Sequence, residues 1–78
     1  MYYVYCLQHQ GNKELYYGYT EDLGRRLKEH QKKDRRWKLI YYEAYFCKTD
    51  ATRMEKKLKD YGQARARLKY RLKDSLSK

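Results

Sequence analysis

Three segments rich in β-forming residues punctuate the first two thirds of the chain. Residues 2–8 (Tyr-Tyr-Val-Tyr-Cys-Leu-Gln) and residues 14–19 (Glu-Leu-Tyr-Tyr-Gly-Tyr) are separated by a turn sequence that ends in Gly11-Asn12. Two such runs around a Gly-Asn turn predict a β-hairpin. Residues 37–46 form a longer run of the same kind, which predicts a third strand.

Apolar positions recur at helical spacing after the hairpin. Leu23, Leu27 and His30 lie at i, i+4 and i+7, which is typical of a helix with one packed face. Thr20 is the expected N-cap, since its side-chain oxygen can accept a hydrogen bond from the first turn. We expect this helix to end near Gln31 and the polar, basic residues that follow to form a loop.

Two more helices are expected after the third strand. The first is capped by Thr49 or Asp50 and buries a stripe of residues, Ala51, Met54 and Leu58. Gly62 is placed to stop it. A last helix, over residues 63–74, buries Ala64, Leu68 and Leu72.

The predicted order of elements is β-β-α-β-α-α. A hairpin and a later strand with helices packed on them predict an α+β fold, a small three-stranded antiparallel sheet flanked by helices. A chain of 78 residues has room for one hydrophobic core, so residues 1–78 are expected to form a single domain.

Charge is the strongest feature of the composition. Twenty Lys and Arg against ten Asp and Glu give a net charge of +10, which favours an acidic polymer as partner over a solvated basic surface or a membrane. The predicted nucleic-acid contacts form two segments: Lys32, Lys33, Arg35, Arg36 and Trp37 in one, and Arg65, Arg67, Lys69, Arg71 and Lys73 in the other.

Cysteine usage and the start of the chain bear on location. Cys6 and Cys47 lie inside apolar runs, have no C-x-x-C or zinc spacing, and are expected to be reduced packing residues. Met1 leads directly into a strand-like run without a signal peptide, and no apolar stretch could span a bilayer. A cytosolic protein is expected, with a monomer as the default state.

Two charged residues stand at the shoulders of the predicted helices. Relative to the packed face of the first helix, Arg26 lies roughly 60° to 70° from its centre, whereas Arg25 points to solvent. In the second helix, Glu55 lies roughly 80° from the buried stripe. This carboxylate has two open interpretations, a salt bridge with Lys59 or a ligand for a hard divalent cation.

Taken together, these residues resemble the GIY-YIG nuclease family, and most closely its short members similar to the nuclease domain of excinuclease C. Tyr3-Val4-Tyr5 corresponds to the family's first motif and Tyr16-Tyr17-Gly18 to its second. The family's arginine falls on Arg26, its R-x-x-x-H pattern places His30, and its metal-binding glutamate falls on Glu55.

The resemblance implies a metal-dependent endonuclease that hydrolyses phosphodiester bonds, in DNA rather than RNA. Glu55 would hold Mg²⁺ or Mn²⁺, Arg26 would stabilise charge on the phosphoryl oxygens, and Tyr5 or Tyr16 would take a proton from water. Family analogy ranks Tyr16 first, whereas His30 is the competing base because its pKa suits neutral pH. The rival interpretation is a non-catalytic nucleic-acid-binding module with the same fold.

Overall fold

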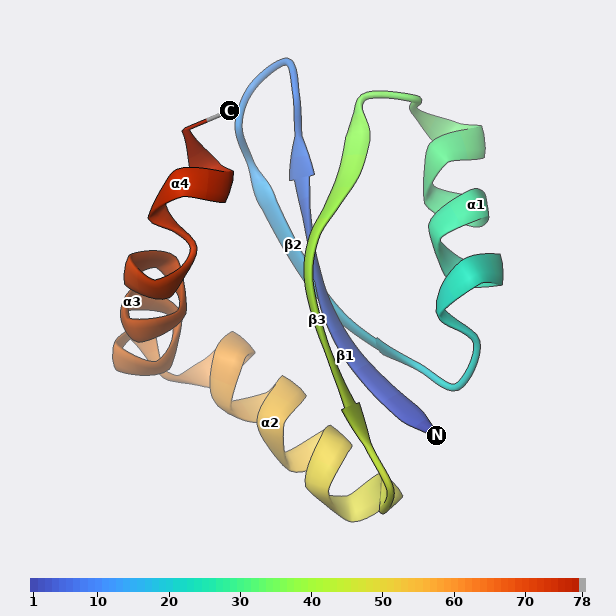
Figure 1. Ribbon diagram of the computed structural model, residues 1–78, viewed down its shortest axis with the longest axis vertical. Helices are drawn as coiled ribbons and strands as arrows, with labels where there is room; N and C mark the ends of the chain where they lie inside the picture. Colours follow the sequence, from blue (N-terminus) through green and yellow to red (C-terminus); the bar gives the residue numbers. More distant parts are fainter. Residues whose placement is uncertain (78) are drawn as a thin grey trace.

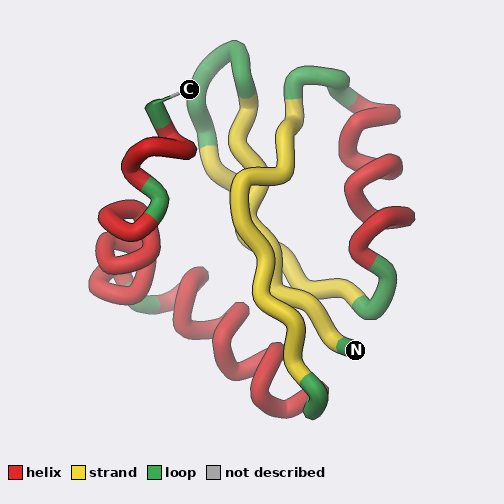
Figure 2. The backbone as a smooth tube through the Cα atoms, in the orientation of Figure 1, coloured by secondary structure: helices red, strands yellow, loops and turns green. Residues whose placement is uncertain are grey.

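A three-stranded sheet with helices on both of its faces forms the architecture of the computed structural model, which describes residues 1–77 (Figures 1 and 2). The elements in chain order are β1 (Tyr2–His9), β2 (Leu15–Thr20), α1 (Leu23–Lys33), β3 (Trp37–Tyr45), α2 (Lys48–Asp60), α3 (Gly62–Arg71) and α4 (Lys73–Leu76). The predicted α+β class is confirmed, and so is the order β-β-α-β-α-α, to which the structure adds the one-turn helix α4.

The sheet has the strand order β2-β1-β3, and both pairings are antiparallel. Side chains alternate between its two faces. Val4 packs against α2 and α3, whereas the next residue, Tyr5, reaches His30 of α1. Figure 1 shows α1 on one side of the strands and α2, α3 and α4 on the other. The sheet therefore has an α1 face and an α2–α3 face.

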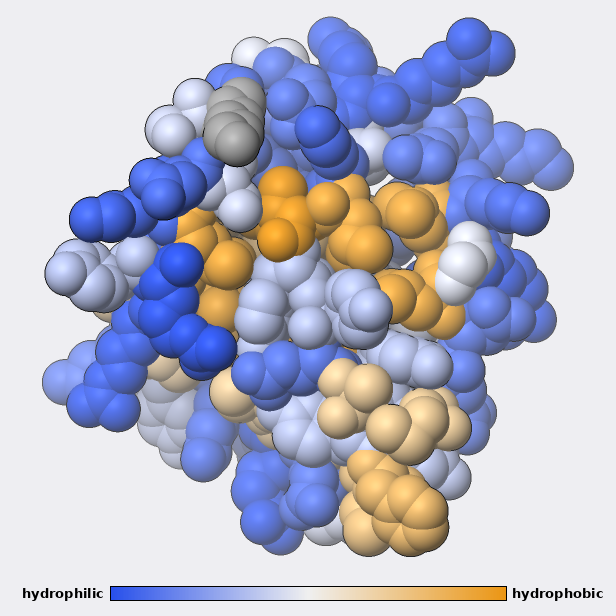
Figure 3. All heavy atoms as spheres, in the orientation of Figure 1, coloured by the Kyte–Doolittle hydropathy of each residue, from blue (hydrophilic) through white to orange (hydrophobic). Residues whose placement is uncertain are grey.

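The hydrophobic core lies on the α2–α3 face. Val4, Ala51, Leu58 and Leu68 are buried together, and a ring of partly buried residues that includes several tyrosines packs around them. These residues confirm the predicted apolar stripes of the last two long helices. Figure 3 shows hydrophobic side chains in the middle of one view of the molecule, over β3, and hydrophilic ones projecting at both sides.

The first helix starts and ends later than the sequence predicts. Asp22 is the N-cap and accepts a hydrogen bond from the Arg25 backbone N–H at 3.1 Å. The Thr20 hydroxyl instead accepts from the Asp22 N–H, so the predicted Thr20 cap is wrong. The helix continues through Lys33. It ends there because the next residue, Asp34, has an extended backbone and is the C-cap.

The predicted ends of the later helices also need correction. The helix α2 begins at Lys48 after Cys47, with no side-chain cap, so neither Thr49 nor Asp50 caps it. Gly62 does not stop this helix but is the first residue of α3. The predicted last helix is divided at Leu72, whose backbone lies outside the helical region.

The two cysteines differ in environment. Cys6 is buried in β1, as predicted, whereas Cys47 is exposed, so its predicted packing role is wrong. Both are free thiols. Within residues 1–77, no helix combines the length and the apolar character that crossing a bilayer requires.

A buried histidine holds the hairpin turn against the loop between α1 and β3. His9 Nδ1 accepts hydrogen bonds from the backbone N–H groups of Gly11 and Asn12, and its Nε2 lies 2.8 Å from the Asp34 carboxylate. Because Nδ1 is an acceptor, Nε2 carries the proton that it donates to Asp34. This clamp fixes where β3 starts and where the aromatic ring of its first residue, Trp37, stands.

Candidate active site

Four predicted site residues converge on the α1 face of the sheet. The Tyr5 hydroxyl lies 3.1 Å from His30 Nε2, and the rings of Tyr16 and His30 are 4.7 Å apart between centroids. Arg26 and Tyr16 also act on the Tyr5 hydroxyl electrostatically, and the rings of Tyr5 and Tyr16 are 6.2 Å apart between centroids. The structure thus brings Tyr5, Tyr16, Arg26 and His30 into one cluster around a single hydroxyl group.

The two arginines of α1 differ as the helical geometry predicts. The Arg26 side chain is 42% exposed and reaches Tyr5, while that of Arg25 is 72% exposed. Both pair with Glu29, at 2.8 Å for Arg26 and 3.7 Å for Arg25. Glu29 holds the Arg26 guanidinium at the edge of the cluster, where its remaining N–H groups can meet a phosphate.

The electrostatics of the cluster keep its central groups neutral. Burial raises the pKa of Tyr5, an effect that hydrogen bonding with Arg26 partly opposes. Burial lowers the pKa of His30, as do the charges of Arg26 and Lys33. Tyr5 therefore keeps its proton and His30 is neutral. Tyr5 donates to His30 Nε2 in the tautomer that carries the His30 proton on Nδ1.

We predict that His30 titrates below its ordinary pKa of 6.5. Between the folded pKa and 6.5 the unfolded chain binds more protons, so His30 lowers the stability of the fold as the pH falls through 6.5 toward the folded value. NMR titration of the imidazole should show this, and Lys33→Ala should raise the pKa by removing a nearby cation. Lys28→Ala, on the same helix, is the control; equal shifts from both variants would contradict the assignment.

Gly18 makes room for the Tyr5 side chain. A Cβ at Gly18 would stand 2.5 Å from the Tyr5 Cζ and hydroxyl oxygen, closer than any relaxed contact. Tyr5 is only 1% exposed, so its ring has nowhere to move without losing the bond to His30. The glycine of the second motif is therefore required by the position of the tyrosine in the first.

Gly18→Ala should destabilise the protein by about 1–3 kcal/mol through overpacking. Gly24→Ala is the matched control, since the nearest atom to its added Cβ would be 3.9 Å away. Gly24 is the second residue of α1, so this change should instead stabilise, by at most the roughly 0.5–1 kcal/mol expected in a helix interior. Urea denaturation of both variants measures the difference. Unchanged stability of Gly18→Ala would show that Tyr5 is not held as described.

Glu55 lies on the other face of the sheet. Its carboxylate pairs with Lys59 at 3.3 Å, so the salt bridge that the sequence left open does form. Within the described residues no hydrogen bond or ion pair joins Glu55 to Tyr5 or Arg26. Its link to the second motif is Tyr19, whose pKa is raised by burial and then by Glu21, Tyr2 and Glu55.

A divalent cation fits the surroundings of Glu55. The Tyr19 hydroxyl is buried without a hydrogen-bond partner, and two carboxylates, Glu21 and Glu55, act on it electrostatically. Among residues 1–77, no group of three or more potential ligands forms a cage. Mg²⁺ often binds proteins through one or two carboxylates while keeping most of its waters, so the Glu55 carboxylate suits such a hydrated ion.

The two basic segments do not form one surface. Lys32 and Lys33 lie in α1 and not in a loop, and Arg35 follows them on the same side of the sheet. Figure 1 shows that α3 and α4 lie on the opposite side, and with them the whole second segment: Arg65, Arg67, Lys69, Arg71 and Lys73. A polyanion that contacts Arg26 would meet the first segment on the same side of the sheet, but would have to pass an edge of the sheet to meet the second.

Two members of the first segment are engaged within the protein. Trp37 is partly buried, with its ring edge-on to His9 at 5.1 Å and to Tyr16 at 6.4 Å between centroids. It therefore positions Tyr16 more than it offers a free stacking surface. Arg36 forms an ion pair with Asp34 at 3.1 Å, which strongly lowers the pKa of that carboxyl.

The sequence interpretation missed three residues at the site. Glu29 orients Arg26, Tyr19 connects the second motif with Glu55, and Tyr42 lies directly opposite Tyr5 across the β1–β3 pair with 54% of its surface exposed. Helical spacing of i, i+3 could have identified Glu29. Tyr42 could be placed only once the register between β1 and β3 was known.

Comparison with known families gives one match. Residues 1–71 match the GIY-YIG catalytic domain, a span that includes both motifs, Arg26, His30 and Glu55. Comparisons with curated proteins and with solved structures found no match. The family match agrees with the three-stranded antiparallel sheet and with the order of the elements.

Proposed function

This chain belongs to the GIY-YIG family of nuclease-type catalytic domains, and we propose that it is a divalent-metal-dependent endonuclease that hydrolyses phosphodiester bonds in DNA. We also propose that residues 1–78 form a single domain, which carries the active site. The observation that carries the proposal is the convergence of Tyr5, Tyr16, Arg26 and His30 on the α1 face. A net charge of +10 supports a polyanionic substrate.

Proton transfer in this proposal starts at Tyr16. Tyr5 is 1% exposed and is screened from solvent, whereas Tyr16 is only partly buried. A tyrosine with an ordinary pKa of about 10 is a poor base alone. We therefore propose that Tyr16 passes its proton to Tyr5, whose ring centroid is 6.2 Å from that of Tyr16 and whose hydroxyl lies 3.1 Å from His30 Nε2. Neutral His30 is the final proton acceptor in this proposal.

The relay balances without a tyrosinate. As the water oxygen attacks phosphorus, one water proton moves to the Tyr16 oxygen, the Tyr16 proton moves to Tyr5, and the Tyr5 proton moves to His30 Nε2. The phosphorus–oxygen bond to the leaving group then breaks, the leaving oxygen takes a proton from solvent water, and His30 returns its proton to solvent. Arg26 offers N–H groups to the phosphoryl oxygens, where charge increases in the transition state. Phosphate binding also offsets the Arg26 charge that lowers the pKa of His30, so the acceptor becomes more basic when substrate is present.

We propose Glu55 as the residue that holds Mg²⁺ or Mn²⁺, with Tyr19 beside it. Such an ion would supply Lewis-acid stabilisation of the phosphate and of the leaving oxygen. The support is the partly buried Glu55 carboxylate and the unpartnered Tyr19 hydroxyl.

The test is a cleavage assay with labelled single-stranded, double-stranded and branched DNA and with RNA, each in Mg²⁺, in Mn²⁺ and in chelator. We expect cleavage of DNA that requires the metal. Cleavage that survives the chelator would overturn the metal requirement, and cleavage of RNA alone would overturn the choice of DNA. Binding of every substrate without cleavage would favour the non-catalytic binding module.

Binding on the α1 side should depend strongly on salt. Lys32 and Arg35 are both exposed and line one shallow surface pocket with Lys28 and Gln31. If each contacts a phosphate of duplex DNA, replacing both with Gln should reduce the slope of log affinity against log salt by about two times 0.9. Fluorescence anisotropy at several salt concentrations measures this slope. An unchanged slope would remove these residues from the interface.

A further inference from the structure

A second concave site lies on the α2–α3 face, between the β1–β2 hairpin and the last two helices. Its volume is about 490 Å³, and its lining includes Gln8, Leu15, Tyr17, Arg65, Lys69 and Leu76. Sites for small organic ligands span roughly 300–1,000 Å³. Since Val4, Cys6 and Gln8 alternate with Tyr5, this pocket is on the side of the sheet away from the Tyr5 cluster.

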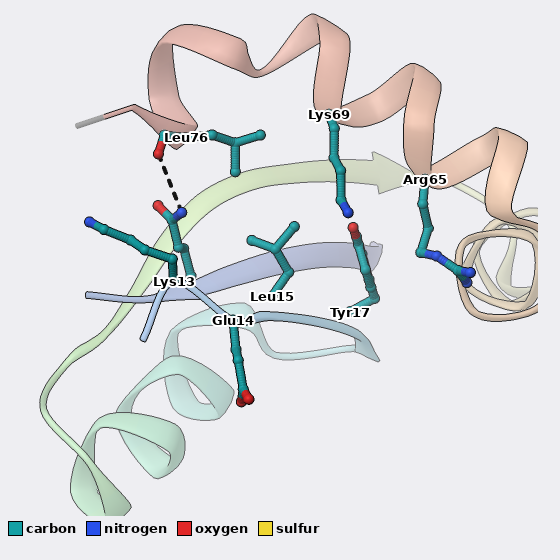
Figure 4. A pocket seen from close by; sticks show the side chains of 8 residues that line it. Lys13, Glu14, Leu15, Tyr17, Arg65, Lys69 and Leu76 are labelled. Atoms are coloured by element: carbon teal, nitrogen blue, oxygen red, sulfur yellow. Dashed lines mark hydrogen bonds between the residues drawn. The ribbon is translucent and has the colours of Figure 1, made fainter. Parts of the chain in front are cut away.

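One end of the pocket is cationic. Figure 4 shows the Lys69 ammonium directed toward the Tyr17 hydroxyl, with Arg65 on the same side. Arg65 Nη1 donates to the carbonyl oxygens of Leu58 at 2.9 Å and Lys59 at 2.7 Å, which fixes the guanidinium in place. The Tyr17 hydroxyl is buried and has no hydrogen-bond partner within residues 1–77. These groups are donors held ready for an anion.

The other end has apolar walls, one buried polar group and, at its edge, Lys13. Leu15 and Leu76 form its walls in Figure 4. Gln8 is 3% exposed, and its Nε2 donates to the Leu76 carbonyl oxygen at 3.4 Å. The Gln8 Oε1 is buried and unpartnered in the described part of the chain, so this end lacks a hydrogen-bond donor.

The charges of the lining favour an anionic ligand. The lining contains three cationic side chains and one carboxylate. The cations are Lys13, Arg65 and Lys69, and the carboxylate is that of Glu14. Figure 4 shows the Glu14 side chain directed away from Tyr17 and Lys69. The pocket therefore combines an anion-binding end with an apolar end that requires a donor from the ligand.

We propose that this pocket binds a nucleotide unit, with the phosphate at Tyr17, Lys69 and Arg65 and the nucleoside between Leu15 and Leu76. A sugar hydroxyl or a base amino group supplies the donor that Gln8 Oε1 lacks. The nucleotide unit is either a free mononucleotide or part of a nucleic-acid strand that reaches this face. The site is independent of the proposed nuclease chemistry, because it shares no residue with the Tyr5 cluster.

NMR titration of the full chain with adenosine 5′-monophosphate, inorganic phosphate and adenosine tests the proposal. We expect saturable shifts of the Gln8, Tyr17 and Lys69 amide signals with the mononucleotide, and weaker binding of phosphate or adenosine alone. Tyr17→Phe and Lys69→Ala should each weaken binding by about tenfold, as expected for loss of a hydrogen bond to a charged group. Tyr17→Phe keeps the ring that packs on the core and so protects the fold.

Lys56→Ala is the matched control, since it removes one positive charge at an exposed position outside the pocket. Equal weakening by Lys69→Ala and Lys56→Ala would reduce the effect to general electrostatics and overturn the site, as would the absence of saturable shifts. A short oligonucleotide distinguishes the two sources. If it displaces the mononucleotide and loses affinity in Lys69→Ala, the ligand is a strand; if the mononucleotide stays bound, the ligand is the free nucleotide. Failure of Arg26→Ala or Glu55→Ala to affect cleavage would leave this result untouched.

Discussion

Arg26→Ala is expected to reduce the rate of DNA cleavage by about 10²–10³, the loss typical of removing one donor that stabilises charge in the transition state. Arg26 interacts with the Tyr5 hydroxyl and stands beside His30. Its loss removes the group that meets the phosphoryl oxygens and also disturbs the hydroxyl at the centre of the relay. The fold should remain intact, since the side chain is 42% exposed and fills no part of the core.

Arg25→Ala provides an unusually close control. Both arginines are on α1, both carry one positive charge, and both pair with Glu29. Of these two arginines, Arg26 also interacts with Tyr5. The difference between the two variants therefore measures the effect of that interaction. Arg25→Ala should lower affinity slightly and leave the turnover rate unchanged. Comparable losses of turnover in single-turnover assays would show that Arg26 has no special role.

The fold was predictable because the core follows simple periodicities. Ala51 and Leu58 repeat at helical spacing and are buried, and the alternating residues of β1 separate a core face from a face with polar chemistry. The position of Arg26 relative to Arg25 came from the same geometry. Burial of apolar surface determines both the core and the orientation of α1. It is also the contribution to the folding free energy that the sequence pattern indicates most directly.

The ends of the helices were not predictable, because alternative capping residues stabilise a helix by similar free energies. Thr20 and Asp22 both carry suitable oxygens, and the structure uses Asp22 as the cap and Thr20 in the preceding turn. Gly62 resembled a C-cap, but none of the described glycines has a positive φ, and the chain turns instead at Tyr61, an extended residue. Differences of about 1 kcal/mol separate such options.

The division of the site between two faces was also beyond the sequence. The sequence did not indicate which face of the sheet Glu55 and the second basic segment occupy, and the connection after β3 carries α2 and α3 to the side opposite α1 (Figure 1). Which face a helix covers depends on the path of the connecting chain. Tyr19, near the end of β2, lies with Glu55 on the core side of the sheet.

Glu55→Ala is expected to abolish metal-dependent cleavage while binding holds or becomes tighter. If Glu55 holds the ion, the variant loses its Lewis acid. The same change raises the net charge from +10 to +11 and so reduces repulsion toward phosphate. The stability should change little, because the pair with Lys59 is an i,i+4 pair on the helix surface worth about 0.3–0.5 kcal/mol.

Asp60→Ala and Lys59→Ala separate the possible causes. Asp60 is an exposed acid on the same helix, so its loss gives the same net charge without affecting the carboxylate beside Tyr19. Lys59→Ala breaks the ion pair and keeps the carboxylate. Cleavage with Mg²⁺ or Mn²⁺, binding in chelator and circular dichroism on all three variants form the measurement. Only Glu55→Ala should lose cleavage; cleavage retained by a folded Glu55→Ala protein would exclude Glu55 as the metal ligand, and equal losses in all three would assign the effect to α2 as a whole.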